Sequence, residues 1–263
     1  MGTRENRKKG ITVLSGKDIE RCMKKTLLDK LLGRPPRIVI TPYDPCCLGS
    51  NSYALHLDPT VKVYKATIPT GMKPAIDYKK YLETPEKLRT RLWFESANYY
   101  ENYINHPENY APINPNFHLN PFEHQETIEI QIPNTGLMLS QRFGYIGSTV
   151  EYTETHGKLF PYIDGKSSIG RNFMLIHQTA GRGDSGFCGN WTLEITITSN
   201  IVVYPGMRIG QIYYDKTSRT PTQYNEIPTS HYQNQSGPTP ASPIIVDPFI
   251  QKYLAQQGAQ RGK

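Results

Sequence analysis

Apolar and polar residues alternate through much of the second half of the chain, which is the pattern of strands that bury one face. In one such segment, Ile128, Ile130 and Ile132 occupy every second position. A turn at Pro205-Gly206 divides the last two segments of this kind. The segments are 126–133, 136–139, 191–203 and 207–214. Short strands at this spacing predict a mainly β fold, a barrel or a sandwich, rather than βαβ units.

A helix is predicted ahead of these strands. Ser15 is a helix-capping residue type, and Asp18 follows it by three residues as in a capping box. Apolar residues then recur on one helical face until Gly33 and Pro35-Pro36 end the pattern. The residues of this face are Ile19, Met23, Leu27 and Leu31. After the helix, segments 38–40 and 52–57 alternate like strands.

Residues 65–123 interrupt the alternation, because tyrosines are mixed there with many Pro and Asn residues without steady periodicity. A helix within 82–103 is compatible with the pattern, but the whole segment is interpreted as an insertion. A second irregular segment, 217–237, is rich in Ser, Thr, Pro, Tyr and Gln and is expected to form a mobile arm. The predicted organisation is a disordered basic arm at 1–10, one domain at 11–240 with the insertion at about 65–123, and a C-terminal extension at 241–263.

Composition excludes several classes of protein. With 263 residues, 37% hydrophobic and 20% charged, the chain can bury a sizeable core. No apolar run approaches the roughly 20 residues that span a bilayer, and the N-terminus lacks the apolar stretch of a signal peptide. A cytoplasmic protein without membrane contact is therefore expected. The four cysteines fit neither a disulfide framework nor a zinc ribbon and are predicted to be reduced: Cys22, Cys46, Cys47 and Cys188.

The net charge of +7 suits an anionic ligand, although part of it lies in the terminal segments. Aromatic and basic residues do not alternate along a strand, so nucleic-acid binding is not expected.

The densest cluster of chemically useful residues runs from 164 to 194. The segment 165–171 combines glycines, two hydroxyls and two cations, and such a loop can present N–H groups and positive charge to phosphates. It lacks the residue order of a Walker loop. Downstream, alternation places Trp191, Leu193 and Ile195 on one strand face and Thr192, Glu194 and Thr196 on the other. By its position alone, Glu194 would be read as a surface residue.

In order along the chain, these segments resemble the dCTP deaminase branch of the dUTPase-like superfamily. The motif R-S-S-x-x-R appears as Lys166-Ser167-Ser168-Ile169-Gly170-Arg171, with Lys in place of the first Arg. A second motif, T-A-x-x-D-x-G-[FW]-x-G-x-x-T-L-E, matches from Thr179-Ala180 to Thr192-Leu193-Glu194. Pro205 to Gln211 matches P-G-M-x-I-G-Q, and Tyr224 with the stretch 232–238 matches the tail. The resemblance covers most of 11–64 and 127–240 but not the segment between them.

The resemblance implies a homotrimer of distorted β-barrels of the dUTPase-like type, each with an N-terminal helix and here a Tyr-rich insertion, and with active sites shared between subunits. It implies dCTP as substrate, deaminated to dUTP and ammonia, with dTTP as a feedback ligand. No zinc is expected. Zinc deaminases need H-x-E and P-C-x-x-C, whereas His124-Gln125-Glu126 stands alone and Pro45-Cys46-Cys47 lacks the second spaced cysteine.

The resemblance also assigns roles. Glu194 acts as general acid and base, Ser167 and Arg171 hold the water and the glutamate, and the Ala180 carbonyl orients the water. Asp184 receives the 3′-hydroxyl of the deoxyribose, and the base edge meets the main chain of Thr192. The remaining predicted substrate-binding residues are Lys166, Ser168, Ile169, Gly170, Leu193, Gln211, Tyr224, His231 and Gln235. His231 stands where the family has Lys. Mg²⁺ is expected to bind through the triphosphate rather than in a protein cage.

Two alternatives remain open at this point. A bifunctional enzyme would also split dUTP into dUMP and pyrophosphate, with Asp184 activating a second water. The stretch His177 to Gly181 is closer to bifunctional members of the family. The other alternative is a non-enzymatic trimer that binds a nucleotide to regulate a partner.

Overall fold

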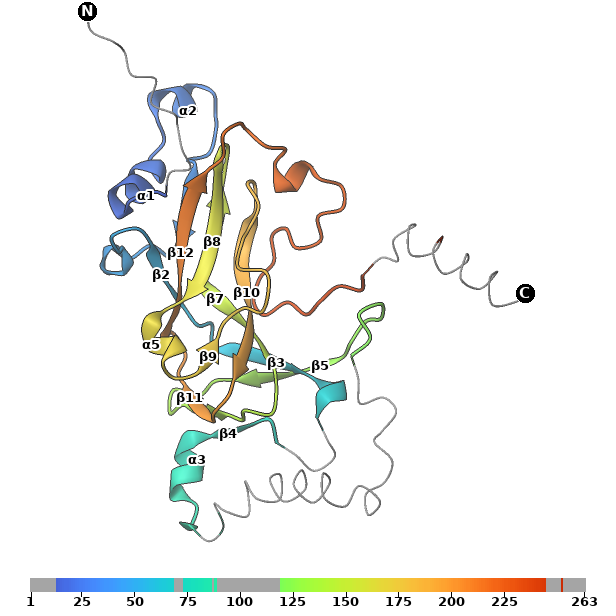
Figure 1. Ribbon diagram of the computed structural model, residues 1–263. Helices are drawn as coiled ribbons and strands as arrows, with labels where there is room; N and C mark the ends of the chain where they lie inside the picture. The colour runs from blue at the N-terminus through green and yellow to red at the C-terminus, as the bar shows by residue number, and fades with distance from the viewer. Residues whose placement is uncertain (1–12, 69–72, 87, 89–118, 245–251, 253–263) are drawn as a thin grey trace, which may run out of the picture.

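The computed structural model describes residues 13–68, 73–86, 88, 119–244 and 252, and within these ranges the chain is mainly β (Figure 1). The predicted arm at 1–10, most of the predicted insertion and nearly all of the C-terminal extension lie outside the described residues. The mainly β class that the alternation predicted is confirmed. No helix within the described ranges is long and apolar enough to cross a membrane.

The largest sheet is built on one long antiparallel pair, β7 (Tyr145–Thr155) and β10 (Cys188–Ile197). Along the main path the strand order is β5-β3-β7-β10-β9, and β1 also pairs with β7. The remaining strands of this sheet are β1 (Ile38–Thr41), β3 (Thr60–Tyr64), β5 (Thr127–Gln131) and β9 (Met174–Leu175).

Two smaller sheets complete the β structure. One has the order β2-β12-β8, and the other has the order β11-β6-β4. The first consists of β2 (Tyr53–His56), β12 (Arg208–Lys216) and β8 (Leu159–Gly165). The second consists of β11 (Ile201–Val203), β6 (Leu137–Leu139) and β4 (Ala75–Asp77). In Figure 1 the first of these sheets runs beside β7 and β10, and the second lies at the end near α3 (Tyr78–Glu83).

The N-terminal helix differs from its prediction, because two helices replace one. The chain forms α1 (Gly16–Cys22), capped by Ser15 as expected, and then α2 (Leu27–Leu31). Thr26 begins the second helix with a reciprocal capping box to Asp29. Leu27 and Leu31 are 86% and 81% exposed, so the apolar face of the first helix does not continue into the second. The chain therefore begins a new helix at the Thr26 cap, although the apolar periodicity predicted that one helix would continue.

Short 3₁₀ segments and one further short helix connect the strands. They are η1 (Pro45–Cys47), η2 (Lys65–Thr67), α5 (Ser167–Gly170) and η4 (Tyr224–Glu226). The four cysteines are free thiols, as predicted.

The alternation of β10 positions the site. Trp191, Leu193 and Ile195 are 6%, 0% and 0% exposed and belong to the core, while the intervening residues are half-buried. Two buried threonine hydroxyls of β7 accept hydrogen bonds from the indole and the backbone of Trp191. Its Nε1 donates to Thr153 Oγ1 at 2.9 Å, and its backbone N–H donates to Thr149 Oγ1 at 2.9 Å. These two bonds lie where the register between β10 and β7 shifts, between Asn190 and Thr192, and Glu194 follows at an alternate position of the strand.

Candidate active site

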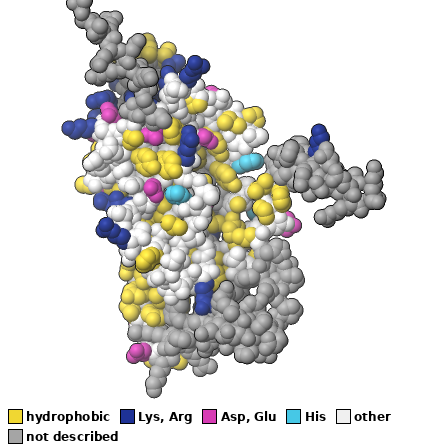
Figure 2. Space-filling view, in the orientation of Figure 1, with side chains coloured by type: hydrophobic (Ala, Val, Ile, Leu, Met, Phe, Trp, Pro, Cys, Tyr) yellow, Lys and Arg dark blue, Asp and Glu magenta, His cyan; other side chains and the backbone are white. Residues whose placement is uncertain are grey.

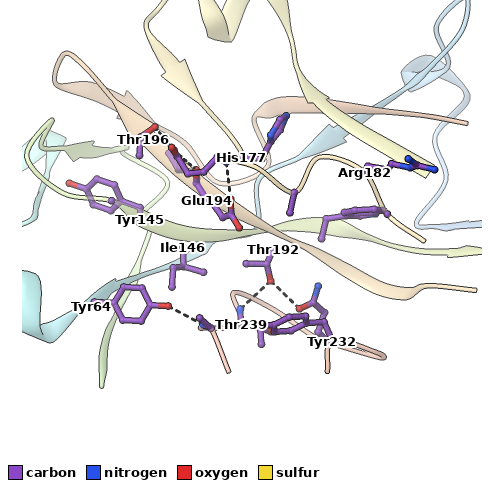
Figure 3. Close-up of a pocket in the computed structure, with 18 of the residues that line it drawn as sticks. Tyr64, Tyr145, Ile146, His177, Arg182, Thr192, Glu194, Thr196, Tyr232 and Thr239 are labelled. Atoms are coloured by element: carbon purple, nitrogen blue, oxygen red, sulfur yellow. Dashed lines mark hydrogen bonds between the residues drawn. The ribbon is translucent and has the colours of Figure 1, made fainter. Parts of the chain in front are cut away.

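A pocket of about 450 Å³ lies beside β10 and is lined by residues of both its faces, Glu194 among them (Figure 3). Its walls come from β7, β10, the loop 177–187 and the tail 224–241. Six of the residues expected to be functional line it: Ala180, Asp184, Thr192, Glu194, Tyr224 and Gln235. The sequence motifs therefore converge on one cavity, although they are spread over some sixty positions.

Glu194 is held in place by a residue that the sequence analysis did not single out. The backbone N–H of Gln178 donates to Glu194 Oε2 at 2.8 Å, and the Gln178 side chain donates to Thr196 Oγ1 at 2.7 Å. Figure 3 shows the loop from His177 lying over Glu194. A backbone donor fixes one carboxylate oxygen and keeps the charge directed at the pocket. The sequence could not have predicted this contact from the residue type at position 178, because the donor is the backbone N–H.

Aromatic rings form much of the remaining wall. Tyr64, Tyr145, Phe187, Trp191, Tyr224 and Tyr232 all line the pocket. The rings of Phe187 and Trp191 pack with centroids 4.8 Å apart. Burial raises the pKa of the Tyr145 hydroxyl, so this group stays neutral. A planar apolar wall beside a carboxylate suits a flat heterocycle whose edge carries polar atoms.

Polar groups gather at the mouth of the pocket. Arg182 lines it and lies over the Phe160 ring, 4.5 Å from the ring centroid. His177 Nε2 is 3.7 Å from Asp164 Oδ1, and its Nδ1 is buried without a hydrogen-bond partner among the described residues. Gly181 sits against this ring so closely that an added Cβ would lie 2.9 Å from it. Arg182 is a cation next to the predicted nucleoside site that the motif comparison left without a role.

The tail is docked along β10, where the composition had predicted a mobile arm. Asn190 N–H donates to the Gln235 carbonyl at 3.0 Å, and the Gln235 side chain accepts from Thr192 Oγ1 at 3.2 Å (Figure 3). The tail is therefore ordered by backbone hydrogen bonds to the start of β10, although its composition is typical of a linker. Tyr224 contributes by accepting from the N–H of Tyr232 at 3.1 Å. His231 is exposed and does not line the pocket, so its predicted phosphate contact stays a prediction.

Gly186→Ala is expected to detach this tail. Gly186 has φ +89°, and an added Cβ would lie 2.6 Å from Gln223 Cβ and 2.7 Å from the backbone nitrogen of Tyr224. Positive φ costs a residue with a Cβ about 1–2 kcal/mol, and the backbone atom cannot rotate away. Hydrogen exchange of residues 223–237 should accelerate at least about tenfold. Gly33→Ala, which also has positive φ but has open space around it, is the matched control; equal exchange in the two variants would contradict the expectation.

The second group of predicted residues lies elsewhere, at α5. Lys166 occupies the N-cap position, Ser167 opens the helix and Arg171 is its C-cap. The expected phosphate loop is therefore one helical turn, anchored by Ile169, which is 6% exposed. Ser167, Ser168, Gly170 and Arg171 are exposed. Figure 2 shows basic side chains on the edge of the molecule where α5 lies.

Gln211 belongs to this second group. Its Nε2 donates to the carbonyl of Gly165 at 3.4 Å, and its Oε1 accepts from Ser52 Oγ at 3.1 Å. Among the described residues, neither Gln211 nor any residue of the stretch 166–171 lines the Glu194 pocket. Leu193 is also separate, because the whole residue is 0% exposed and does not line the pocket. One chain thus carries two groups of predicted site residues that do not share a cavity.

The chain is similar to proteins of a known family. The sequence model of the dCTP deaminase-like family matches residues 87–217, beginning inside the segment interpreted as an insertion. A protein of Leptospira biflexa named "dCTP deaminase, dUMP-forming" is 33% identical over 204 residues, which are 78% of this chain and 86% of that protein. A Cytophaga hutchinsonii protein with the same name is 44% identical over 110 residues, 42% of this chain and 61% of that protein, just under two thirds of its length.

Solved structures give weaker likenesses. A 2′-deoxycytidine 5′-triphosphate deaminase from Agrobacterium tumefaciens superposes with a TM-score of 0.45 at 16% identity, covering 79% of this chain and 49% of that one. A dUTPase of EIAV superposes with a TM-score of 0.26 at 24% identity, covering 35% of this chain and 86% of that one.

Proposed function

The chain belongs to the dCTP deaminase-like family. From that premise we propose that it converts dCTP to dUMP in two steps, deamination to dUTP and then hydrolysis of dUTP, which releases pyrophosphate. The sequence alone favoured dUTP as the product. The names of the relatives favour the bifunctional alternative, and Asp184 in the same pocket as Glu194 supports it. The observation that carries the proposal is the Glu194 carboxylate, fixed by a backbone donor beside an aromatic wall.

In the deamination step, Glu194 removes a proton from water while the water oxygen bonds to C4 of the cytosine ring. Glu194 delivers this proton to N3, then takes the second proton from the new C4 hydroxyl and gives it to the amino group, which leaves as ammonia when the C4 carbonyl forms. Ser167, Arg171 and the Ala180 carbonyl position the water and the carboxylate. Among the described residues lining the pocket, His177 is the sole His or Cys, so they do not offer the donor set of a zinc deaminase.

The aromatic wall and the tail hold the nucleoside. The base packs against the rings, and the 3′-hydroxyl is received by Asp184. Lys166, Ser168 and Gln211 bind phosphates, together with Tyr224, His231 and Gln235 from the tail. Mg²⁺ would be held mainly by the substrate phosphates and would neutralise part of their charge. The two carboxylates that line the pocket, Asp184 and Glu194, suit a cation held mainly by its substrate rather than by a protein cage.

The separation of the two groups of site residues supports a shared site. Arg171 and Ser167 lie on α5, away from the pocket that holds Glu194 of the same chain. A closed cyclic assembly brings different surfaces of neighbouring subunits together at each interface. In the proposed homotrimer, α5 of one subunit completes the pocket of the next and supplies Ser167 and Arg171, which do not line the Glu194 pocket of their own chain.

The product distinguishes the candidate functions. Purified protein with dCTP and Mg²⁺ is expected to release ammonia and pyrophosphate in equal amounts and to accumulate dUMP. Asp184→Asn should keep ammonia release but accumulate dUTP, because an amide cannot activate the second water. Chromatography of the nucleotides and a coupled ammonia assay measure both.

Glu123→Gln removes an exposed carboxylate away from the pocket and serves as the control, with the dUMP product expected unchanged. Accumulation of dUTP by the wild-type protein would leave simple deamination as the activity. Nucleotide binding without any ammonia would instead favour the regulatory trimer, whose partner contacts would then need explaining.

A further inference from the structure

A second cluster of chemically active side chains lies where β7 ends and β10 begins. The strand register places Cys188 directly opposite Glu154. His156 follows Glu154 by two positions and lies just beyond the end of β7. One ligand-type atom from each residue lies within 4.8 Å of the others, and His156 Nε2 is 2.9 Å from Glu154 Oε2.

We propose that Glu154, His156 and Cys188 form a Zn²⁺ site, with water as the fourth ligand. Imidazole nitrogen, carboxylate oxygen and thiolate sulfur are the three donor types that zinc takes in proteins, at about 2.0–2.3 Å. Donors at those lengths around a tetrahedral ion are roughly 3.3–3.7 Å apart. The present spacing therefore needs side-chain movements of about 1 Å. The thiol and the imidazole disfavour Mg²⁺ and Ca²⁺, which prefer oxygen donors.

The surroundings suit an ion that enters from solvent and is then shielded. Glu154 and His156 side chains are each 26% exposed, and Cys188 is 9% exposed. The Tyr152 hydroxyl interacts with both Glu154 and Cys188. Burial, followed by the Glu154 charge, raises the pKa of the Cys188 thiol, so zinc must displace its proton: RSH and Zn²⁺ give the zinc thiolate and H⁺.

This site is separate from the Glu194 pocket, since none of its three residues lines that cavity. It is instead joined to the tail. The Cys188 N–H donates to Gln233 Oε1 at 3.3 Å, and Asn234 N–H donates to the Cys188 carbonyl at 2.7 Å. An ion ligated by Cys188 fixes the strand end to which the tail is bonded. The inference does not depend on the proposed function, because zinc binding is measurable without substrate.

The test uses the full chain, stripped with a chelator and titrated with Co²⁺ and then with Zn²⁺. Co²⁺ is expected to produce a thiolate-to-cobalt charge-transfer band that one equivalent of Zn²⁺ removes. Cys188→Ser should abolish the band. His156→Gln, at a half-exposed position where misfolding is not expected, should weaken Zn²⁺ binding by more than about 100-fold. Hydrogen exchange at 233–235 should slow when zinc binds.

Two matched variants guard against adventitious ligands. Cys46→Ser removes an exposed thiol and His124→Gln removes an exposed imidazole, and both should keep the band and the affinity. A band absent from the wild-type protein would reduce the cluster to a hydrogen-bonded His–Glu pair beside a thiol. A band that survives Cys188→Ser, or vanishes in Cys46→Ser, would also overturn the proposal.

Discussion

Glu194→Gln is expected to lower the rate of ammonia release from dCTP by about a thousandfold, since general acid–base groups contribute about 10²–10⁴-fold. The amide has the shape of the carboxylate, and its oxygen can still accept the hydrogen bond from the Gln178 N–H that now reaches Oε2. Folding and dCTP affinity should therefore change little, because the variant loses only the capacity to take up a proton. Single-turnover ammonia release gives the rate, and calorimetric titration with dCTP gives the affinity.

A strand glutamate away from the pocket provides the control. Glu129 is exposed on β5, near the Lys62 ammonium at 3.7 Å, and Glu129→Gln should leave both rate and affinity unchanged. Equal ammonia release by Glu194→Gln and the wild-type protein would remove Glu194 from the mechanism. A loss confined to dCTP affinity would assign it to binding alone.

Two inactive variants are expected to restore each other when mixed. In the proposed homotrimer with shared sites, Arg171→Ala and Glu194→Gln should each disable every site of their own assembly. In a random mixed trimer with shared sites, each site draws an intact Arg171 and an intact Glu194 with a probability of about one quarter. Unfolding and refolding an equal mixture should thus recover about a quarter of the wild-type rate, whereas either variant alone stays inactive.

The control for this experiment is a mixture without refolding, which keeps the trimers separate and should remain inactive. If Arg171 and Glu194 of one chain served the same site, no mixture would recover activity. That result would contradict the shared site but not the role of Glu194, which the first experiment tests by itself.

The central strand of the largest sheet was not identified from the sequence. β7 is the longest strand among the described residues, yet the buried positions of its second half are Thr149, Glu151, Thr153 and Thr155, with exposures of 0–2%. A pattern of apolar residues cannot reveal a strand whose inner face is polar. Three of these side chains are tolerated because they are paired: Glu151 Oε2 accepts from the His56 N–H at 2.9 Å, Thr149 Oγ1 accepts from the Trp191 N–H and Thr153 Oγ1 accepts from Trp191 Nε1.

Strand alternation and ordered motifs were sufficient for other features. The opposite faces of Leu193 and Glu194, the turn at Gly206, the Ser15 cap and the reduced cysteines all agree with expectation. Each depends on a residue's own geometry or on its immediate neighbours. Such local rules hold whatever the rest of the chain does.

What the sequence determined by itself was the mainly β class, the family resemblance and the residue types available for chemistry. Tertiary structure alone decided how those residues are grouped. It brought Asp184, Glu194 and Gln235 to one cavity and kept Arg171 out of it. It docked the tail on β10, and it set Glu154 and His156 against Cys188 from segments more than thirty residues apart in sequence. The physical reason is that strand register and backbone pairing act across long sequence separations, where no local pattern records which segments meet.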